Sequence, residues 1–258
     1  QFFSLKKFGL IGKTLKHSFS KDFFNHKFEN EKIEASYHNF EIDKITSLRS
    51  IFSKNDIFGL NVTVPYKEQV LSQLDELDEV ARKIGAVNTI LPFYKNGKLS
   101  SLKGFNTDAF GFQQLIKPYL KAHHTNALVL GSGGSSKAII YILNLYNIDY
   151  NIISRTQKAD NPKCFTWEEI NSFMVKHHPL IINTTPIGMY PNINQEFEFP
   201  YQYISKNHLI IDLIYNPKLT NFLKKSNSQN AQILNGYQML VHQALKAWNI
   251  WNSSINNK

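Results

Sequence analysis

The stretch that most constrains the fold is an apolar run that ends in glycines and leads into a segment of helical periodicity. Residues 127–130 form the apolar run, and residues 131–134 contain three glycines. Apolar side chains then recur at helical spacing from Ile139 to Tyr146. The run indicates a buried parallel strand, and the later spacing indicates a helix. The sequence therefore predicts a strand, a tight turn and a helix in direct succession.

The glycine turn is typical of a dinucleotide site. Gly131 can take the sharp turn, and Gly133 lets the backbone approach a diphosphate, which the amides and positive dipole end of the helix then bind. Gly134 adds freedom, and Ser136 stands where a small residue packs the helix on the sheet. The alternative is a turn that binds nothing. Its place between a predicted strand and a predicted helix favours dinucleotide binding.

The next predicted strand, residues 150–153, indicates which dinucleotide. An NAD site usually carries a carboxylate at the end of this strand, about 20 residues further on. This chain has no acidic residue there and offers Ser154, Arg155, Thr156 and Lys158. A guanidinium and hydroxyls suit a 2′-phosphate, so we expect NADP. The alternative is that Arg155 is a solvated surface arginine.

Composition sets the broad class. The chain has 258 residues, enough for one large or two ordinary domains, and is 42% hydrophobic and 19% charged, as in soluble globular proteins. No apolar run approaches the roughly 20 residues of a membrane span, and we expect no signal peptide and a cytoplasmic location.

Cysteine, histidine and charge exclude other classes. The one cysteine, Cys164, excludes an internal disulfide, and the nine histidines lack ligand spacing, so no metal is expected. The net charge of +9 comes from dispersed lysines, which favours capture of anionic small molecules over nucleic-acid binding.

The first segments combine strands with a phenylalanine-rich helix. A strand over residues 8–11 precedes a helix whose buried face carries phenylalanines at 19, 23, 24 and 28. Ser18 and Ser20 lie at the start of this helix. One of them is interpreted as an N-cap, or the two, with His17 alongside, bind a carboxylate.

A strand over 36–40, a helix over 42–52 started by Asp43, and a strand over 58–64 follow. Pro65 ends that strand and is suited to open the next helix. Thr63 and Lys67 therefore fall at the carboxyl end of a strand, where α/β proteins bind ligands.

The next segments lead to the domain boundary. A helix over 75–84 is ended by Gly85, and a strand carries Asn88. The pair at 96–97, Asn-Gly, predicts a hairpin that makes residues 91–102 antiparallel. A polar cluster then opens an amphipathic helix at Asp108 that runs through Leu120.

Beyond the glycine turn we expect a helix over 167–175 and parallel strands over 180–184 and 208–213. A short strand over 231–234 and a helix over 237–251 complete the pattern. No further strand follows this helix, so it is expected to pack back on the first domain or to span the two.

Together these segments resemble the shikimate dehydrogenase family over nearly the whole chain. In chain order they are HSFS at 17–20, NVTVPYK at 61–67, GAVNT at 85–89, GFNTD at 104–108, GSGGSSK at 131–137, SRT at 154–156, NTTPIGM at 183–189, DLIY at 212–215 and NGYQMLVHQA at 235–244. Each motif alone is weak, but their shared order is not expected by chance.

The resemblance implies an α/β enzyme of two domains. An N-terminal α/β substrate domain is expected over 1–107 plus 237–258, and a Rossmann-like, doubly wound NADP-binding domain over 108–236. The C-terminal helix thus returns to the first domain.

The implied reaction is the reversible NADPH-dependent reduction of 3-dehydroshikimate to shikimate, a step of chorismate and aromatic amino acid biosynthesis. Lys67 and Asp108 match the family's catalytic pair. A positioned amine or ammonium can transfer the proton that accompanies hydride transfer, and a carboxylate can orient it. Without the motifs, Lys67 would be interpreted as a solvated lysine and Asp108 as an N-cap.

The resemblance also implies substrate and cofactor contacts. Ser18, Ser20 and Tyr215 would bind the carboxylate of the substrate, and Thr63, Asn88, Asp108 and Gln243 its ring hydroxyls. Tyr215 and Gln243 can alternatively be ordinary core or helix-face residues. The cofactor would be held by Gly131, Ser132, Gly133, Gly134, Ser135, Ser154, Arg155, Thr156, Lys158, Thr184, Leu213 and Gly236.

Three positions depart from the family pattern. Phe105 stands where an acidic residue is common, Lys21 where a proline is common, and Leu213 where methionine is common. Two other functions remain open: a quinate and shikimate dehydrogenase of broader specificity, and a non-catalytic nucleotide-binding regulator. A small-molecule substrate, no nucleic acid or membrane partner, and a monomer or homodimer are expected.

Overall fold

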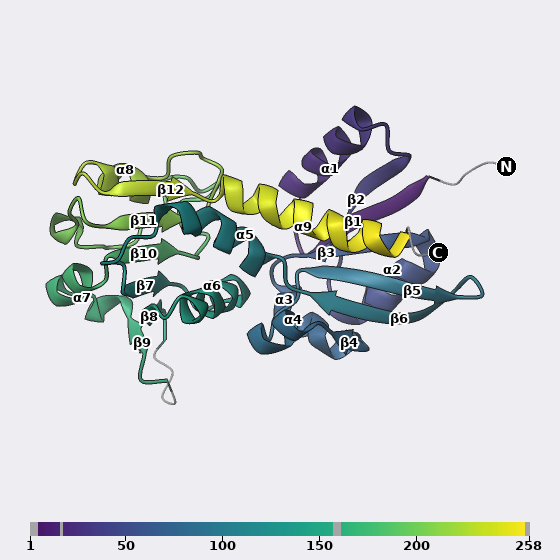
Figure 1. Ribbon diagram of the computed structural model, residues 1–258, viewed down its shortest axis with the longest axis horizontal. Coiled ribbons are helices and arrows are strands. Elements are labelled where there is room, and N and C mark those ends of the chain that lie inside the picture. The colour runs from purple at the N-terminus through teal and green to yellow at the C-terminus, as the bar shows by residue number, and fades with distance from the viewer. Residues whose placement is uncertain (1–4, 16–17, 157–160, 256–258) are drawn as a thin grey trace. The chain divides into compact units, whose positions relative to one another are not determined.

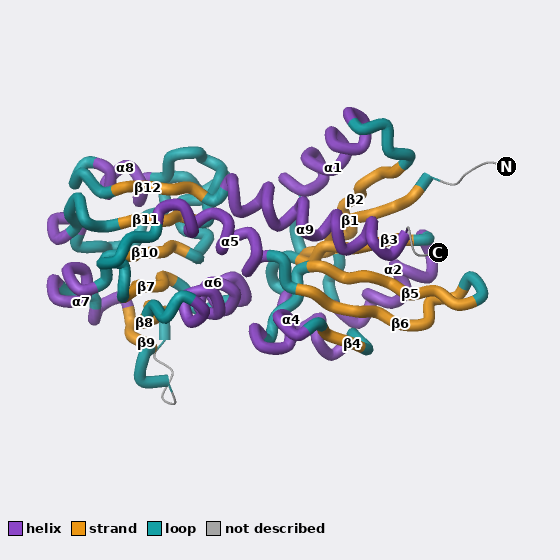
Figure 2. The backbone as a smooth tube through the Cα atoms, in the orientation of Figure 1, coloured by secondary structure: helices purple, strands orange, loops and turns teal. Residues whose placement is uncertain are grey.

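The computed structural model describes residues 5–15, 18–156 and 161–255 and divides into two compact units (Figure 1). The first unit comprises Gln1–Thr107 and Gln243–Lys258, and the second comprises Asp108–His242. Among the described residues, each unit contains a six-stranded sheet with helices around it (Figure 2). Each unit therefore has its own sheet and its own hydrophobic core.

The sheet of the first unit is mixed. Its order is β2-β1-β3-β5-β6-β4, with bounds β1 Lys6–Gly12, β2 Ala35–Glu41, β3 Ile57–Val62, β4 Glu76–Leu77, β5 Thr89–Lys95 and β6 Lys98–Phe105. Strand β1 is parallel to β2 and β3, whereas β5 is antiparallel to β3 and β6. The helices are α1 Phe19–Asn30, α2 Leu48–Asn55, α3 Tyr66–Gln69, α4 Glu79–Ile84 and the 3-10 turns η1 Ile45–Ser47 and η2 Val70–Gln73.

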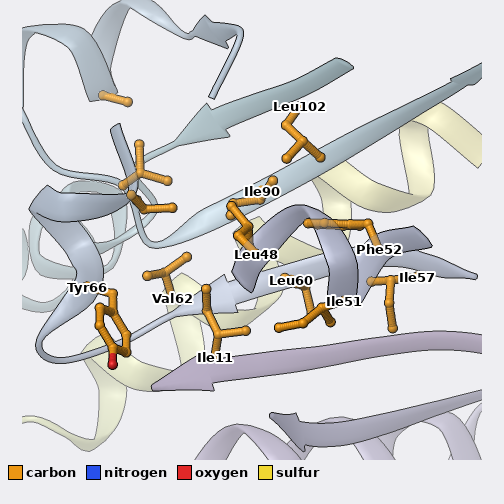
Figure 3. Packing of buried hydrophobic residues seen from close by; sticks show 13 residues of the cluster. Ile11, Leu48, Ile51, Phe52, Ile57, Leu60, Val62, Tyr66, Ile90 and Leu102 are labelled. Atoms are coloured by element: carbon orange, nitrogen blue, oxygen red, sulfur yellow. The ribbon is translucent and has the colours of Figure 1, made fainter. Parts of the chain in front are cut away.

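Two hydrophobic clusters cover this sheet. In Figure 3, Leu48 and Phe52 of α2 lie against the strands of the sheet, in the same cluster as Leu60. The second cluster is aromatic and joins Phe8 of β1 to α1 and to Trp251 of α9 (Tyr237–Ile255). Because successive residues of β3 contribute to different clusters, the two clusters lie on opposite faces.

Trp251 anchors α9 to the first unit. Its indole nitrogen donates a hydrogen bond of 3.0 Å to the carbonyl oxygen of Ile90, and its side chain is fully buried. Only glycine fits at Gly59 on β3, because a Cβ there would lie 2.3 Å from the same indole nitrogen. The end of α9 is therefore packed directly on the backbone of the sheet.

The sheet of the second unit is fully parallel. Its order is β12-β11-β10-β7-β8-β9, with bounds β7 Asn126–Leu130, β8 Asp149–Ser154, β9 Cys164–Thr166, β10 Leu180–Asn183, β11 Leu209–Asp212 and β12 Gln232–Asn235. The helices are α5 Asp108–Ile116, α6 Gly134–Leu145, α7 Ser172–His177, α8 Asn221–Asn227 and the 3-10 turns η3 Lys117–Tyr119, η4 Trp167–Glu169 and η5 Tyr201–Tyr203. This order reverses between β7 and β10, as in doubly wound nucleotide-binding sheets.

The cores explain the continuous apolar runs of the sequence. All four residues of β10, and residues 127–130 of β7, are buried. Strands in a parallel sheet are covered on both faces, so apolar and polar residues do not alternate along them. In the described ranges, no helix combines the length and apolar character needed to cross a membrane.

Some predicted elements are wrong. The helix expected from Asp75 begins only at Glu79, after β4, because Asp78 is the N-cap and accepts from the amide of Ala81 at 2.9 Å. The helix expected from Asp43 is a 3-10 turn followed by α2. The helix expected over 167–175 is interrupted because Asn171 caps a separate α7. Strand β9 was not predicted.

Candidate functional site

The glycine turn after β7 has the backbone that the sequence predicts. Gly131 has a φ of +110°, which side-chain-bearing residues rarely adopt, and its amide donates to the carbonyl of Ile153 at 2.8 Å. A Cβ on Gly131 would lie 2.5 Å from the hydroxyl oxygen of Thr184. Position 131 therefore requires glycine both for its conformation and for its close approach to the loop after β10.

The start of α6 is open toward its surroundings. Gly133 is the N-cap and has no side chain to bond the amides of the first turn. Apart from its two chain neighbours, no atom of the described residues lies within 4 Å of where a Cβ on Gly133 would lie. The hydroxyl of Ser136 turns back and donates to the carbonyl of Gly133 at 2.6 Å. A helix start of this kind suits an anionic diphosphate.

Residues that directly follow β10 and β11 lie near this turn, at the reversal of strand order. The backbone amide and hydroxyl of Thr184 both donate to the carbonyl of Leu130 at 2.8 Å. The amide of Leu213 donates to the carbonyl of Asn183 at 3.0 Å. Thr184 and Leu213 thus lie at the carboxyl edge of the sheet, where ligands bind in doubly wound folds.

Gly236 packs against the same edge from the end of β12. It is buried, and a Cβ there would lie 1.9 Å from the carbonyl oxygen of Leu213. Its amide donates to the carbonyl of Ile214 at 3.1 Å. The structure therefore brings Gly131, Thr184, Leu213 and Gly236 to one edge of the second sheet.

The end of β8 carries the residues expected to distinguish NADP from NAD. The hydroxyls of Ser154 and Ser132 lie 3.1 Å apart, and Arg155 and Thr156 are exposed. Lys158 lies outside the described residues. The described residues of this strand end contain no carboxylate, and Arg155 supplies an exposed guanidinium there.

Asp212 is a buried carboxylate that sequence reasoning did not single out. It is 0% exposed, and it accepts hydrogen bonds from the hydroxyl of Thr220, the side-chain amide of Asn183 and the backbone amide of Ile214. Burial raises the pKa of Asp212 to about 6, against the opposing effect of these hydrogen bonds. The sequence signal that could have identified Asp212 is a single acidic residue at the end of an otherwise apolar strand.

The first unit contains a buried polar cluster around Asn88. The backbone amide of Thr107 donates to Oδ1 of Asn88 at 2.7 Å. Because a backbone amide can only donate, Oδ1 must face it, and the amide nitrogen of Asn88 must face the hydroxyl of Thr107 and Oε1 of Gln243, at 3.0 and 3.4 Å. Asn88 is therefore oriented as a hydrogen-bond donor on the side of Gln243.

The serines before and in α1 have different partners. Ser18 is the N-cap of α1, and its hydroxyl oxygen accepts from the amide of Lys21 at 3.2 Å. Its hydroxyl hydrogen is not used in this bond, so the N-cap role leaves a donor for a carboxylate. The side chain of Ser20 lies near the hydroxyl of Tyr37. His17 lies outside the described residues.

Lys67 and Asp108 stand at the starts of helices in different units. Lys67 is partly buried in α3, and its carbonyl accepts from the amide of Val87 at 2.8 Å, next to Asn88. Thr63 precedes α3, and its carbonyl accepts from the amide of Tyr66 at 2.9 Å. Asp108 is 6% exposed at the first position of α5.

The predicted substrate residues are therefore divided between the two units. The first unit contains Ser18, Ser20, Thr63, Lys67, Asn88 and Gln243, and the second contains Asp108 and Tyr215. Tyr215 is partly buried in the loop between β11 and α8. The cluster around Asn88 also contains Tyr37, Asn61 and Thr107, which the sequence did not assign to a site.

Comparison with known proteins identifies the family. Residues 10–90 match the family described as shikimate dehydrogenase substrate binding domain. A shikimate dehydrogenase (NADP⁺) of Clostridium beijerinckii is 38% identical over 97% of this chain and 94% of the relative. A shikimate dehydrogenase (NADP⁺) of Methanosphaera stadtmanae is 36% identical over 94% of this chain and 90% of the relative. The chain belongs to the shikimate dehydrogenase family.

Solved members of the shikimate dehydrogenase family share the fold. Shikimate dehydrogenase 1 from Peptoclostridium difficile superposes with a TM-score of 0.80 at 37% identity, covering 96% of this chain and 92% of that one. The shikimate 5-dehydrogenase from Thermus thermophilus, solved in complex with NADP(H) and shikimate, superposes with a TM-score of 0.81 at 26% identity. The match covers 96% of this chain and 94% of that one. The predicted family and the α/β class with a Rossmann-like unit are confirmed.

Proposed function

We propose that this chain catalyses the reversible NADPH-dependent reduction of 3-dehydroshikimate to shikimate, with Lys67 and Asp108 as the catalytic pair. The observation that carries the reaction is membership of the shikimate dehydrogenase family along almost the whole chain. The assignment of the first unit to the substrate and of the second to the cofactor belongs to the same proposal.

The residues of the second unit fit the cofactor. The backbone at Gly131 and the open side of Gly133 accommodate a diphosphate, and Arg155 offers charge to a 2′-phosphate. Ser132, Gly134, Ser135, Ser154 and Thr156 complete this part of the proposed site, with Thr184, Leu213 and Gly236 toward the nicotinamide. NADPH, when bound, supplies the hydride.

Lys67 would hold the proton that the reaction requires. When a carbonyl carbon receives hydride, its oxygen must gain a proton, and the ammonium of a lysine can donate it; the neutral amine serves the reverse direction. Asp108 would orient that ammonium and accept a hydrogen bond from a ring hydroxyl. Burial of Asp108 and partial burial of Lys67 favour such charge-assisted bonds over exchange with water.

The other polar residues would recognise the substrate. Ser18, Ser20 and Tyr215 offer hydroxyl donors to its carboxylate, and Thr63, Asn88 and Gln243 bind ring hydroxyls. Asn88 is already oriented as a donor by Thr107. A site that leaves such buried groups unpaired rejects an analogue lacking the matching hydroxyl, often by orders of magnitude.

An absorbance assay of NADPH formation tests the proposal, with shikimate and quinate each offered NADP⁺ and NAD⁺. Rapid turnover of shikimate with NADP⁺ is expected. Comparable turnover of quinate would favour the broader dehydrogenase, and NADPH binding without turnover of either acid would favour the regulator. The cytoplasmic location and the monomeric or homodimeric state stay predictions.

A further inference from the structure

We propose that Tyr37 is a positioning residue for the substrate site, acting through a one-way series of hydrogen bonds that ends at Asn88. The inference rests on the proposed function, because it assigns Asn88 to a ring hydroxyl of the substrate. It adds Tyr37, Asn61 and Thr89, none of which is expected to touch the substrate, to the set of residues that determine its recognition.

Tyr37 is held rigidly in β2. Its ring is 1% exposed and stacks on Phe24 of α1, with ring centroids 4.7 Å apart and planes at 11°. The side chain of Asn25 bonds both the amide and the carbonyl of Tyr37, at 2.8 and 3.1 Å. Burial raises the pKa of the Tyr37 hydroxyl well above its ordinary value, so the hydroxyl stays protonated and remains a donor at working pH.

The direction of the first hydrogen bond is determined by Asn61. The amide nitrogen of Asn61 lies 3.1 Å from the carbonyl oxygen of Asn88, which can only accept. The oxygen of Asn61 must therefore face the hydroxyl of Tyr37, 2.7 Å away, and Tyr37 must donate. Asn61 is 4% exposed, so this bond is shielded from water.

Thr89 carries the series from Asn61 to Asn88. Its hydroxyl oxygen accepts from the amide nitrogen of Asn61 at 3.1 Å, so its hydrogen points elsewhere. Its possible acceptors are Oδ1 of Asn88 at 3.2 Å and the hydroxyl of Thr107 at 3.3 Å. Both belong to the cluster that orients Asn88.

The series has two consequences for Asn88. It adds a donor to Oδ1, which keeps the amide nitrogen facing Gln243, the side on which a ring hydroxyl is proposed to bind. It also polarises the amide, because hydrogen bonds in a series strengthen one another in a low-dielectric interior. Loss of the Tyr37 hydroxyl should therefore weaken the bond from Asn88 to a ring hydroxyl without removing either partner.

Ser20 offers a competing route from Tyr37 to the substrate. Its side chain lies near the same phenol hydroxyl, and it is expected to bind the carboxylate. Since the hydrogen of Tyr37 is directed to Oδ1 of Asn61, Ser20 receives no hydrogen bond from it. The proposal therefore places the functional effect of Tyr37 at Asn88 and not at Ser20.

The test is a pair of double-mutant cycles on kcat/KM for shikimate at saturating NADP⁺. Tyr37→Phe should lower kcat/KM by about 3- to 10-fold, the worth of one hydrogen bond. In an Asn88→Ala background, Tyr37→Phe should lower kcat/KM by less than about twofold. In a Ser20→Ala background, it should lower kcat/KM by the same factor as in the wild type. NADPH affinity should be unchanged.

Matched variants separate positioning from loss of folding. Tyr94→Phe removes another tyrosine hydroxyl of the same sheet, which donates to the carbonyl of Ile57 at 2.7 Å, and should leave kcat/KM unchanged. Thr89→Val interrupts the series downstream with little change of shape and should reproduce the coupling to Asn88 if Tyr37→Phe folds poorly.

The outcomes distinguish this proposal from the function it rests on. A wild-type chain that does not oxidise shikimate with NADP⁺ defeats the proposed function. An active wild type whose Tyr37 effect is additive with Asn88→Ala, or is coupled to Ser20→Ala instead, defeats only the role assigned to Tyr37.

Discussion

The hydroxyl of Thr220 donates a hydrogen bond of 2.6 Å to Oδ2 of the fully buried Asp212. Thr220 is also the N-cap of α8, where its hydroxyl oxygen accepts from the amide of Leu223 at 3.3 Å. Through Asn183 and the backbone amide of Ile214, the same carboxylate joins the end of β10 to the loop after β11. One acidic side chain thus ties together three segments at the carboxyl edge of the second sheet.

Asp212 should give the stability of the protein a distinct pH dependence. Burial raises its pKa from 3.8 to about 6, so the folded state binds the proton more tightly than the unfolded state. Stability contributed by this group is therefore present below about pH 4 and is lost as pH rises to about 6, a change of about 3 kcal/mol. Asp212→Asn should lack this slope in urea unfolding.

Asp149 provides a control of opposite sign. Its side chain is exposed and pairs with Lys163, whose hydrogen bond lowers the pKa of Asp149. Its stabilising effect is therefore present at higher pH and is lost as pH falls through the folded-state pKa. If the unfolding curves of wild type and Asp212→Asn run parallel from about pH 4 to about pH 7, the account of Asp212 is wrong.

Gly131 and Gly133 should respond differently to alanine. Gly133→Ala adds a methyl where, apart from the chain neighbours, no atom in the described part of the chain lies within 4 Å, at a φ of −85° that any residue adopts. We expect the unfolding free energy to change by less than about 0.5 kcal/mol. The Kd for NADPH should nevertheless rise about tenfold or more, because the methyl occupies the approach of the diphosphate.

Gly131→Ala should instead damage the fold. The positive φ and the 2.5 Å approach to Thr184 predict a loss of more than about 1 kcal/mol of stability. Thermal unfolding and NADPH titration of both variants check this contrast. Wild-type NADPH affinity in Gly133→Ala would argue against a diphosphate at this turn.

Arg155→Ala should weaken NADPH selectively. Loss of charge-assisted bonds to a 2′-phosphate should raise the Kd for NADPH by about 10- to 100-fold. The Kd for NADH should stay within about twofold of the wild-type value. Lys224→Ala removes another exposed positive charge from the second unit and should change neither the Kd for NADPH nor the Kd for NADH. Equal weakening of both cofactors in Arg155→Ala would remove the basis for this specificity.

Local signals predicted much of the fold. The hairpin between β5 and β6 follows from Asn96 and Gly97, whose φ angles of 51° and 72° suit a tight hairpin turn. Gly85 ends α4 at a φ of 69°. Such positions are recognisable because the conformation depends on the residue itself.

Long-range partners account for what could not be predicted. The carboxylate of Asp75 accepts from the amide of Leu102 at 2.7 Å and bonds Arg49, so it is not available to start a helix. The orientation of Asn88 depends on Thr107 and on Gln243, 155 residues away in the sequence. The spacing of apolar residues along the chain carries no information about such long-range contacts. Only the family motifs assigned Asn88 and Gln243 to one site.

The Lys67→Ala variant tests the proposed proton transfer, with kcat for shikimate oxidation and the Kd for NADPH measured on the same preparation. Removal of the proton-transferring group should lower kcat by about 100-fold or more while the Kd for NADPH stays within about twofold of wild type. Retained turnover together with weakened NADPH binding would contradict the assignment of Lys67 as the group that moves the proton.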